Sequence, residues 1–392
     1  MRLRYGRASI WLQNTTIGGI RQRKPGGRQT LNSRERTFLA LDFEEPDRAP
    51  VDFWMSEGFR QKLESALGTS KAAFLDAHDV DLRYIEGPAY IGPSLRGFSD
   101  GDEDIWGVRR RTVAVRVGDG EEAYKEVAVS PLASAETVEE IDGYDHWPSA
   151  DWFDYGEVEA QCEAIRKQER AVVFMGDRLN RIAQLKPAMY LRGMEQILVD
   201  MTLRPALAEA VFSHIRKFYC AYADRIFAAA NGKLDIVLTG DDFGSQNGPL
   251  VSPRMWTDFL GDGFGDYIEI AKGYGLRVMH HTCGSVRPMI PLMIARGLDV
   301  LQSLQPEASD MDARELKAAF GSRLAFHGGI SIQRTLPFGT PGAVRREVRD
   351  RVDALGMGGG YILCTSHNIQ ADTPVENVQA LLGAYRDYGR YI

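Results

Sequence analysis

The sequence predicts an α/β protein that folds as a single (β/α)8 TIM barrel. From Ser33 onward, short apolar runs alternate with longer amphipathic segments, and this alternation is typical of a repeated strand–helix unit. The short runs are continuously apolar, as expected for parallel strands that helices cover on both faces. Eight such units fit the 392-residue chain better as one closed barrel than as an open sheet.

Each unit can be placed by residue. The expected strands are Val51–Met55, Leu82–Ile85, Ala171–Met175, Leu234–Leu238, Leu276–His280, Val300–Ser303, Leu324–His327 and Tyr361–Cys364. Helical patterns lie between most of them, among them Arg204–Ala230, Pro253–Tyr274, Val286–Arg296 and Met311–Phe320. These amphipathic segments are expected to form the outer ring of the barrel.

One interval departs from this alternation. Trp106–Val115 and Glu122–Val129 alternate polar and apolar residues on either side of Gly118-Asp119-Gly120, which predicts a β-hairpin. The hairpin falls between the second and third strands. We interpret it as an excursion on the barrel rim that could act as a lid, and not as a separate domain.

The N-terminal stretch differs from the rest of the chain. Residues 1–32 carry seven Arg or Lys residues, no Asp or Glu, and two Gly-Gly pairs. We expect a basic, disordered extension, so the barrel spans 33–392. An organelle transit peptide and a start codon placed too early are the alternatives, whereas the apolar core of a secretory signal is missing.

Charge and hydropathy limit the partners. The net charge of −7 gives no basic surface for nucleic acid, and no apolar run reaches the roughly 20 residues that cross a membrane. The four cysteines have no spacing typical of a disulfide framework, which favours a reducing cytoplasm. Cys162 and Cys220 lie inside helical patterns and are expected to be small buried hydrophobic residues.

Polar residues gather just after the strands, where the active sites of barrel enzymes are built. His281 and Cys283 flank one residue after the fifth strand, and Cys364 ends the eighth. Imidazole and thiolate ligands suit zinc, and three protein ligands leave one position open for catalysis. The sequence therefore predicts a zinc site of His281, Cys283 and Cys364. A structural role for either cysteine, or a regulatory disulfide between them, stays open.

His280 adjoins His281, and strand alternation sends the two side chains to opposite faces. We prefer His281 because it shares its face with Cys283. Further candidates for substrate or proton handling follow other strands, and they are Asp241, Asp242, Gln246, Gln305, His327 and His367. The two aspartates could orient the substrate, or one of them could be the fourth zinc ligand in the resting state. They could instead cap or turn the chain before Gly244, and each histidine could be structural.

These residues belong to motifs that resemble a known family. The motifs, in order, are Arg34–Arg36, Glu45–Val51, Gly240–Gln246, Gly248–Pro253, His281–Ser285, Gly359–Cys364 and Thr373–Val378. Because it carries these motifs in this order, the chain resembles the uroporphyrinogen decarboxylase superfamily. Within it, the chain is similar to the zinc-dependent corrinoid methyltransferases of the methylcobamide:coenzyme M type.

Four observations favour the methyltransferase branch. Its members carry His-x-Cys followed by a distant Cys, which His281, Cys283 and Cys364 match. True decarboxylases have Asn where Cys364 stands, and a cationic pair of which only Arg60 is present here. Their Phe-Ser-Asp segment is missing from its expected place, since Phe98–Asp100 lies in a displaced loop. Arg60 remains a candidate substrate-binding residue.

The resemblance implies methyl transfer between a corrinoid and a small molecule. A substrate thiol deprotonated at zinc would attack the methyl group of a methyl-cobalt corrinoid, with Co(I) leaving. In the opposite direction, a methylated substrate would pass its methyl group to Co(I), and the sequence leaves both directions open. The corrinoid would be carried by a partner protein, and the chain is compatible with a homodimer.

Two other functions stay open. A decarboxylase of a tetrapyrrole would need cationic clamps for carboxylates, for which Arg60, Arg83 and Arg178 are available. This function would not explain the predicted zinc ligands His281, Cys283 and Cys364. A non-catalytic module that binds zinc or a corrinoid would need a fourth protein ligand that closes the metal site.

Overall fold

The computed structural model describes residues 31–118, 120–176 and 181–391, and Leu31–Ile392 forms one compact unit. The predicted disordered extension lies outside these residues except for its last two. One of those, Asn32, caps helix α1 (Ser33–Leu41): its side chain accepts from the N–H of Glu35, and the Glu35 side chain accepts from the N–H of Asn32. Asp119 at the hairpin turn and the candidate clamp Arg178 are also outside.

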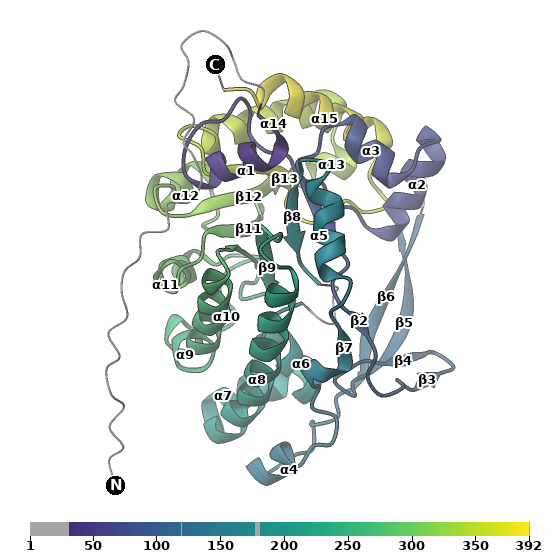
Figure 1. Ribbon diagram of the computed structural model, residues 1–392, viewed down its shortest axis with the longest axis vertical. Helices are drawn as coiled ribbons and strands as arrows, with labels where there is room; N and C mark the ends of the chain where they lie inside the picture. Colours follow the sequence, from purple (N-terminus) through teal and green to yellow (C-terminus); the bar gives the residue numbers. More distant parts are fainter. Residues whose placement is uncertain (1–30, 119, 177–180, 392) are drawn as a thin grey trace. The chain divides into compact units, whose positions relative to one another are not determined.

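A parallel sheet of seven strands forms the centre of the fold (Figure 1). In their order across the sheet, the strands are β1 (Leu82–Ile85), β8 (Ala171–Phe174), β9 (Ile236–Gly240), β10 (Arg277–His281), β11 (Val300–Leu304), β12 (Ala325–Ile330) and β13 (Tyr361–Thr365). Consecutive neighbours pair in parallel, and the curled sheet gives a TIM-like α/β fold. Seven of the eight predicted strands are thus confirmed, with ends shifted by up to three residues.

The eighth predicted strand, Val51–Met55, does not join the ladder as a regular strand. It makes isolated bridges, from Val51 to Leu363 of β13 and from Met55 to Ile369. The N–H of Asp81, just before β1, donates to the carbonyl of Val51 at 2.8 Å. On the side of β13, the N–H of Asp52 donates to the carbonyl of Leu363 and the N–H of Leu363 donates to that of Pro50, both at 2.8 Å. The segment therefore contacts both edges of the sheet, through isolated bridges and not through a continuous ladder. Pro50 has no N–H to extend the pairing.

Fifteen helices occur among the described residues. They are α1, α2 (Glu57–Leu67), α3 (Lys71–Ala77), α4 (Val138–Asp142), α5 (Val158–Arg166), α6 (Leu185–Arg192), α7 (Met194–Leu203), α8 (Pro205–Ala229), α9 (Pro253–Phe259), α10 (Gly261–Gly273), α11 (Ile290–Ala295), α12 (Ala313–Phe320), α13 (Thr335–Phe338), α14 (Pro341–Leu355) and α15 (Val375–Tyr388). Figure 1 shows α5, α8, α10, α12 and α14 outside the sheet. Of the helices described, none is long and apolar enough to cross a membrane.

The predicted hairpin is confirmed. Strands β5 (Arg109–Val117) and β6 (Gly120–Val129) are antiparallel and, with β3 (Gly97–Phe98) and β4 (Gly101–Glu103), form a four-stranded sheet that falls between β1 and β8 in the sequence. Figure 1 shows this small sheet beside the parallel sheet. A second small sheet pairs β2 (Ala89–Tyr90) with β7 (Phe153–Asp154). Tyr124 of β6 donates to Oε1 of Gln370 at 2.7 Å. The hairpin therefore contacts the segment that follows β13.

The apolar core has two parts, on the two faces of the parallel sheet. The larger part packs the strands against the helices. The smaller part forms the inner face, and its members on strands are Leu82, Ala171, Val173, Ile236, Leu238, Met279, Val300, Ala325, Ile362 and Cys364. Side chains two residues apart on a strand share a face. The next layer of inward-facing side chains, toward the carboxyl ends of the strands, is therefore formed by residues that come two positions later on the same strands.

Candidate functional site

The layer above the inner apolar core is polar. Tyr84, His281, Gln302 and His327 each come two residues after an apolar member of that core on the same strand. Register places His281 beside Gln302, and Gln302 beside His327. His281, Gln302 and His327 are buried. Buried polar side chains need partners, and these residues find them in two neighbouring clusters.

His281 and Cys283 form the centre of the first cluster. Nε2 of His281 lies 3.4 Å from Sγ of Cys283. Nδ1 of His281 contacts Oε1 of Gln302, and because an amide oxygen only accepts, this contact places the ring proton on Nδ1. Nε2 therefore presents its lone pair to the cluster. His367 completes it, since the ligand atoms of His281, Cys283 and His367 lie within 4.8 Å of one another.

The predicted opposite orientation of His280 and His281 is confirmed by their contacts. Nδ1 of His280 lies 2.8 Å from Oγ1 of Thr239, and its ring stacks on Phe243 with centroids 5.2 Å apart. The ring of His281 instead lies 5.5 Å from that of His367. Of these two neighbours, His281 is the one that belongs to the metal-ligand candidates.

Asp242 borders the first cluster. One of its oxygens, Oδ1, accepts from the N–H of Cys283 at 3.0 Å and lies 3.5 Å from Nε2 of His281. The other, Oδ2, pairs with the ammonium of Lys186 at 2.8 Å. The carboxylate therefore fixes the backbone of the His281–Cys283 turn and places a negative charge beside it.

Burial controls how these groups ionise. Burial lowers the pKa of His281, which keeps the imidazole neutral, as a metal ligand must be. Burial, and after it the charge of Asp242, raises the pKa of Cys283 to about 12. Burial also opposes ionisation of Asp242, but the interaction with the His281 imidazole, followed by the Lys186 ammonium and the Cys283 N–H, holds the pKa of this carboxyl low.

Asp241 has a different position from its neighbour. Its carboxylate accepts from three successive backbone N–H groups, those of Gln184 at 2.6 Å, Leu185 at 3.0 Å and Lys186 at 2.7 Å. These are the unpaired N–H groups at the start of α6. The structure thus places Asp241 as a cap of α6, and Asp242 alone of the predicted pair reaches the His281 cluster.

A second, fully buried cluster contains Cys364. The ligand atoms of Asp52, His327 and Cys364 lie within 4.8 Å of one another. Nε2 of His327 lies 2.9 Å from Oδ2 of Asp52, which also accepts from the hydroxyl of Tyr84 at 2.5 Å and from Nε1 of Trp54 at 3.0 Å. Among the residues described, Nδ1 of His327 has no hydrogen-bond partner.

The three predicted zinc ligands therefore lie in two different clusters. It brings His281 and Cys283 together with His367, and it groups Cys364 with Asp52 and His327. All three histidines predicted after strands thus lie in the polar layer or at its edge.

The remaining candidates occupy less central positions. Gln305 is buried, and its Oε1 accepts from the N–H of Gly284 at 2.9 Å, so it supports the turn that carries Cys283. Gln246 is exposed on the loop after β9. Arg60 lies on α2, where Glu57 and Glu64 both pair with its guanidinium. The structure gives Arg60 carboxylate partners on its own helix.

Several residues around the two clusters were missed by the sequence analysis. They are Asp52, Trp54, Tyr84, Lys186 and Gln302. Asp52 and Gln302 carried a signal, because each interrupts an apolar run expected to be a buried strand. Lys186 carried none, since it precedes the strand end of Asp242 by more than fifty residues and only the fold brings them together.

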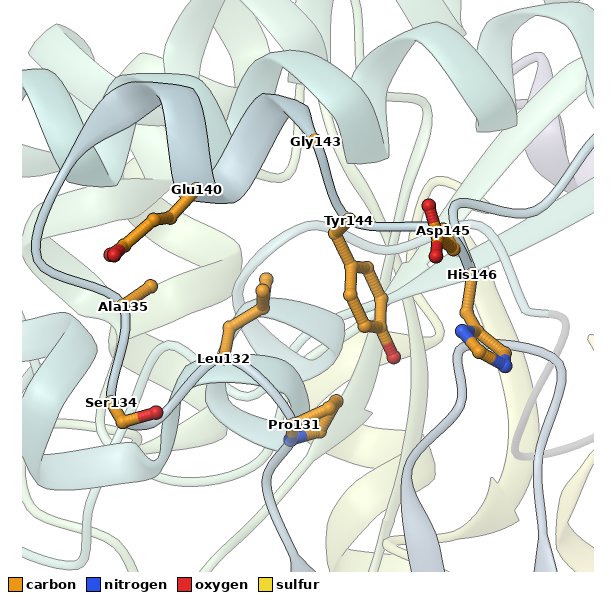
Figure 2. Close-up of a pocket in the computed structure, with 9 residues that line it drawn as sticks. All are labelled: Pro131, Leu132, Ser134, Ala135, Glu140, Gly143, Tyr144, Asp145 and His146. Carbon is orange, nitrogen blue, oxygen red and sulfur yellow. The ribbon is translucent and has the colours of Figure 1, made fainter.

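One cavity among the described residues lies elsewhere. It has a volume of about 440 Å³ and is lined by residues in and around α4, including Leu132, Glu140, Tyr144 and His146 (Figure 2). None of the lining residues belongs to either cluster. We place the chemistry at the His281 and Asp52 clusters, because titratable side chains converge there at the carboxyl ends of the strands.

Together, the fold and these clusters define a TIM-like α/β protein with candidate metal-ligand groups at the carboxyl edge of its sheet. Residues 131–388 match the model of the uroporphyrinogen decarboxylase (URO-D) family. The chain belongs to this family. The resemblance seen in the sequence motifs is thus confirmed at the level of the family.

Individual relatives match over shorter segments. A uroporphyrinogen decarboxylase from Actinobacillus succinogenes is 30% identical over 76 residues, which are 19% of this chain and 21% of the relative. One from Azoarcus sp. is 34% identical over 80 residues, 20% of this chain and 22% of the relative. The matched segments span about a fifth of the length of these curated relatives.

Among solved structures, a methyltransferase from Methanosarcina mazei is similar with a TM-score of 0.62. The similarity covers 92% of this chain and 99% of that one, at 17% sequence identity. It supports the TIM-like fold of nearly the whole chain.

Proposed function

We propose that this protein is a zinc-dependent methyltransferase that moves a methyl group between a corrinoid, carried by a partner protein, and a small thiol or methylated substrate. The observation that carries the proposal is the pair of His281 Nε2 and Cys283 Sγ, 3.4 Å apart at the end of β10. We also propose that Val51–Met55 acts as the eighth strand and closes the sheet into a barrel.

The donor set fits zinc. Zinc binds imidazole nitrogen at about 2.0–2.1 Å and thiolate sulfur at about 2.3 Å. Two tetrahedral ligands at those distances lie roughly 3.5 Å apart, close to the 3.4 Å between the His281 and Cys283 atoms. The contact of His281 Nδ1 with Gln302 supplies the outer hydrogen bond that orients a metal-binding imidazole. His367 and Cys364 are the candidates for a third ligand.

When bound, zinc would lower the pKa of a substrate thiol or polarise the leaving atom of a methylated substrate. The residues of this chain would hold and orient the reactants. Asp242 fixes the Cys283 backbone and is itself held by Lys186. Cys283 and His367 are partly exposed, so a substrate can approach from their side. The proposal covers methyl transfer in either direction, to the corrinoid or from it.

The test combines metal analysis with a transfer assay. Protein prepared without chelators is expected to hold about one zinc per chain, and to demethylate methylcobalamin in the presence of a thiol, followed by the change in the visible corrinoid spectrum. Cys283→Ala is expected to lose both the zinc and the transfer. Cys220→Ser, which changes a partly buried thiol on α8, is the matched control.

A tetrapyrrole decarboxylase is the second candidate, because the curated relatives carry that name. Two of its three candidate clamps are already neutralised: Arg60 by Glu57 and Glu64, and Arg83 by Asp76 at 2.7 Å. Zinc-free wild-type protein that decarboxylates a tetrapyrrole would replace the methyltransferase proposal. A zinc-loaded protein that turns over neither substrate would favour a non-catalytic binding module.

A further inference from the structure

We infer that the third metal ligand is His367 and that Cys364 does not bind the metal. The inference rests on the proposed function, and it names the ligand set of that same site as His281, Cys283 and His367. This set contains one thiolate, whereas the motif by which the chain resembles the corrinoid methyltransferases would supply two. Position, access to solvent and the partners of Cys364 support it separately.

The position of His367 is set by the turn after β13. The hydroxyl of Thr365, the last residue of β13, donates to the carbonyl of His367 at 2.7 Å. This short-range bond closes the turn and directs the imidazole toward β10. Its ring centroid lies 5.5 Å from that of His281, with the planes 68° apart. His367 thus reaches the cluster that contains the free Nε2 of His281 and Sγ of Cys283.

The chain beyond His367 is also anchored. Nε2 of Gln370 donates to the carbonyl of Asn368 at 3.1 Å, and Oε1 of Gln370 accepts from Tyr124 at 2.7 Å. The N–H of Ala371 donates to Glu122 at 3.2 Å. The hairpin therefore fixes the loop that presents His367, which reduces the entropy lost when its side chain is held in one position.

Cys364 belongs to the other cluster. It shares the inner face of β13 with Ile362 and belongs to the apolar inner core. Its sulfur lies 3.9 Å from Oγ1 of Thr365. Its ligand atom is grouped with those of Asp52 and His327, which contact each other at 2.9 Å, and not with those of His281 and Cys283. The Cys364 side chain therefore lies in the buried cluster.

Access to solvent separates the two groups further. Cys364, Asp52 and His327 are 1%, 1% and 0% exposed. Cys283 and His367 are partly exposed. A catalytic metal needs an open position that a substrate can reach. Only the group of His281, Cys283 and His367 meets this requirement among the clusters that the described residues form.

The decisive measurement is zinc X-ray absorption on the wild-type protein, because it counts sulfur ligands without any substitution. We expect one sulfur at about 2.3 Å and the remaining ligands at about 2.0–2.1 Å. Two sulfur ligands would overturn the inference and restore Cys364.

Substitutions of the candidate ligands give an independent test of which residues bind zinc. His367→Ala is expected to lose most of its zinc on dialysis, whereas Cys364→Ser is expected to keep about one zinc per chain. The matched controls are His214→Ala, which removes a histidine paired with Asp142 outside the site, and Cys220→Ser. Zinc loss in Cys364→Ser with circular dichroism like that of the wild type, and retention in His367→Ala, would overturn the inference.

The failure of the inference and the failure of the proposed function are distinguishable. Two sulfur ligands together with methyl transfer would sink the ligand set and keep the function. One sulfur ligand without methyl transfer to or from any corrinoid would keep the ligand set and sink the function. Wild-type protein that binds no zinc would overturn both.

Discussion

The indole of Trp54 stacks on the imidazole of His281, with ring centroids 6.1 Å apart and planes 28° apart. The same indole lies 5.9 Å from the ring of His327. Its Nε1–H is shared between Asp52 at 3.0 Å and the hydroxyl of Tyr84 at 2.8 Å. Trp54 therefore connects the exposed cluster of His281 with the buried cluster of Asp52, through one side chain that both clusters hold in place.

This contact makes Trp54 a reporter of metal binding. Addition of Co²⁺ to zinc-free protein is expected to quench part of the tryptophan emission, because the ion would bind next to the stacked ring. In Trp54→Phe that quenching should disappear, while the other five of the six tryptophans still emit. Trp152→Phe is the matched control, since Trp152 packs on Tyr90 outside the clusters. Equal quenching in wild type and Trp54→Phe would contradict the placement of the metal beside His281.

A second prediction concerns the segment Val51–Met55, which isolated bridges hold at the edges of the sheet. Asp81 is fully buried and accepts from Arg36 at 2.6 Å, from Arg48 at 2.5 Å and from the N–H of Val51 at 2.7 Å. Asp81→Ala would remove the buried acceptor that two cations and a backbone donor share, although Arg36 would keep Asp47 and Arg48 would keep Asp79. We expect a loss of about 3–5 kcal/mol in the free energy of unfolding, measured by urea denaturation.

The control for Asp81 is Asp76→Ala. Asp76 is 57% exposed and pairs with Arg83 at 2.7 Å, so its removal should cost about 0–1 kcal/mol. If both variants unfolded at the same urea concentration, the buried network around Asp81 would not be what secures Val51.

The third prediction tests the contact between the hairpin and the loop that carries His367. Glu122 is buried and accepts from the hydroxyl of Ser56, from the N–H of Gly58 at 3.3 Å and from the N–H of Ala371 at 3.2 Å. In Glu122→Ala these donors lose their acceptor, which costs about 1–3 kcal/mol. The amide of Ala371 is expected to exchange its hydrogen faster by mass spectrometry.

Glu126→Ala is the control, because Glu126 lies on the same strand but is exposed and pairs only with Arg111, at 3.3 Å. Faster exchange at residues 366–373 should appear in Glu122→Ala and not in Glu126→Ala. Unchanged exchange in both would show that the loop keeps its position without the hairpin.

Local patterns predicted most of the fold, and longer-range contacts decided the site. Seven strands and the hairpin follow from hydropathy periodicity, which each segment carries by itself. The eighth strand was predicted for the same reason, but Val51 and Met55 pair through isolated bridges and form no regular ladder. The sequence also identified the strand ends that bear His281, Cys283 and Asp242. It could not tell whether Cys364 or His367 reaches them, because this depends on the turn after β13 and on its contact with the distant hairpin.

The sequence likewise could not distinguish the roles of Asp241 and Asp242, because the two residues are adjacent. Both follow β9, and the fold sends one carboxylate to the start of α6 and the other to the Cys283 turn. The segment that begins α6 lies more than fifty residues earlier in the chain. Only the packing of α6 on β9 determines which aspartate meets it.

The fourth prediction separates these two aspartates by their effects. Asp241→Ala removes the acceptor of three buried N–H groups and is expected to destabilise the protein by about 1–3 kcal/mol while zinc remains bound. Asp242→Asn keeps the shape but removes the charge beside His281 and Lys186, and is expected to lower zinc affinity about 10- to 100-fold, as loss of an outer-shell partner does. Urea denaturation and competition with a zinc chelator measure the two effects. Asp312→Ala, which removes the cap of α12 far from the metal site, controls for the loss of a helix cap alone and should cost about 1 kcal/mol. If Asp241→Ala lost zinc while Asp242→Asn kept it, the two roles would have to be exchanged.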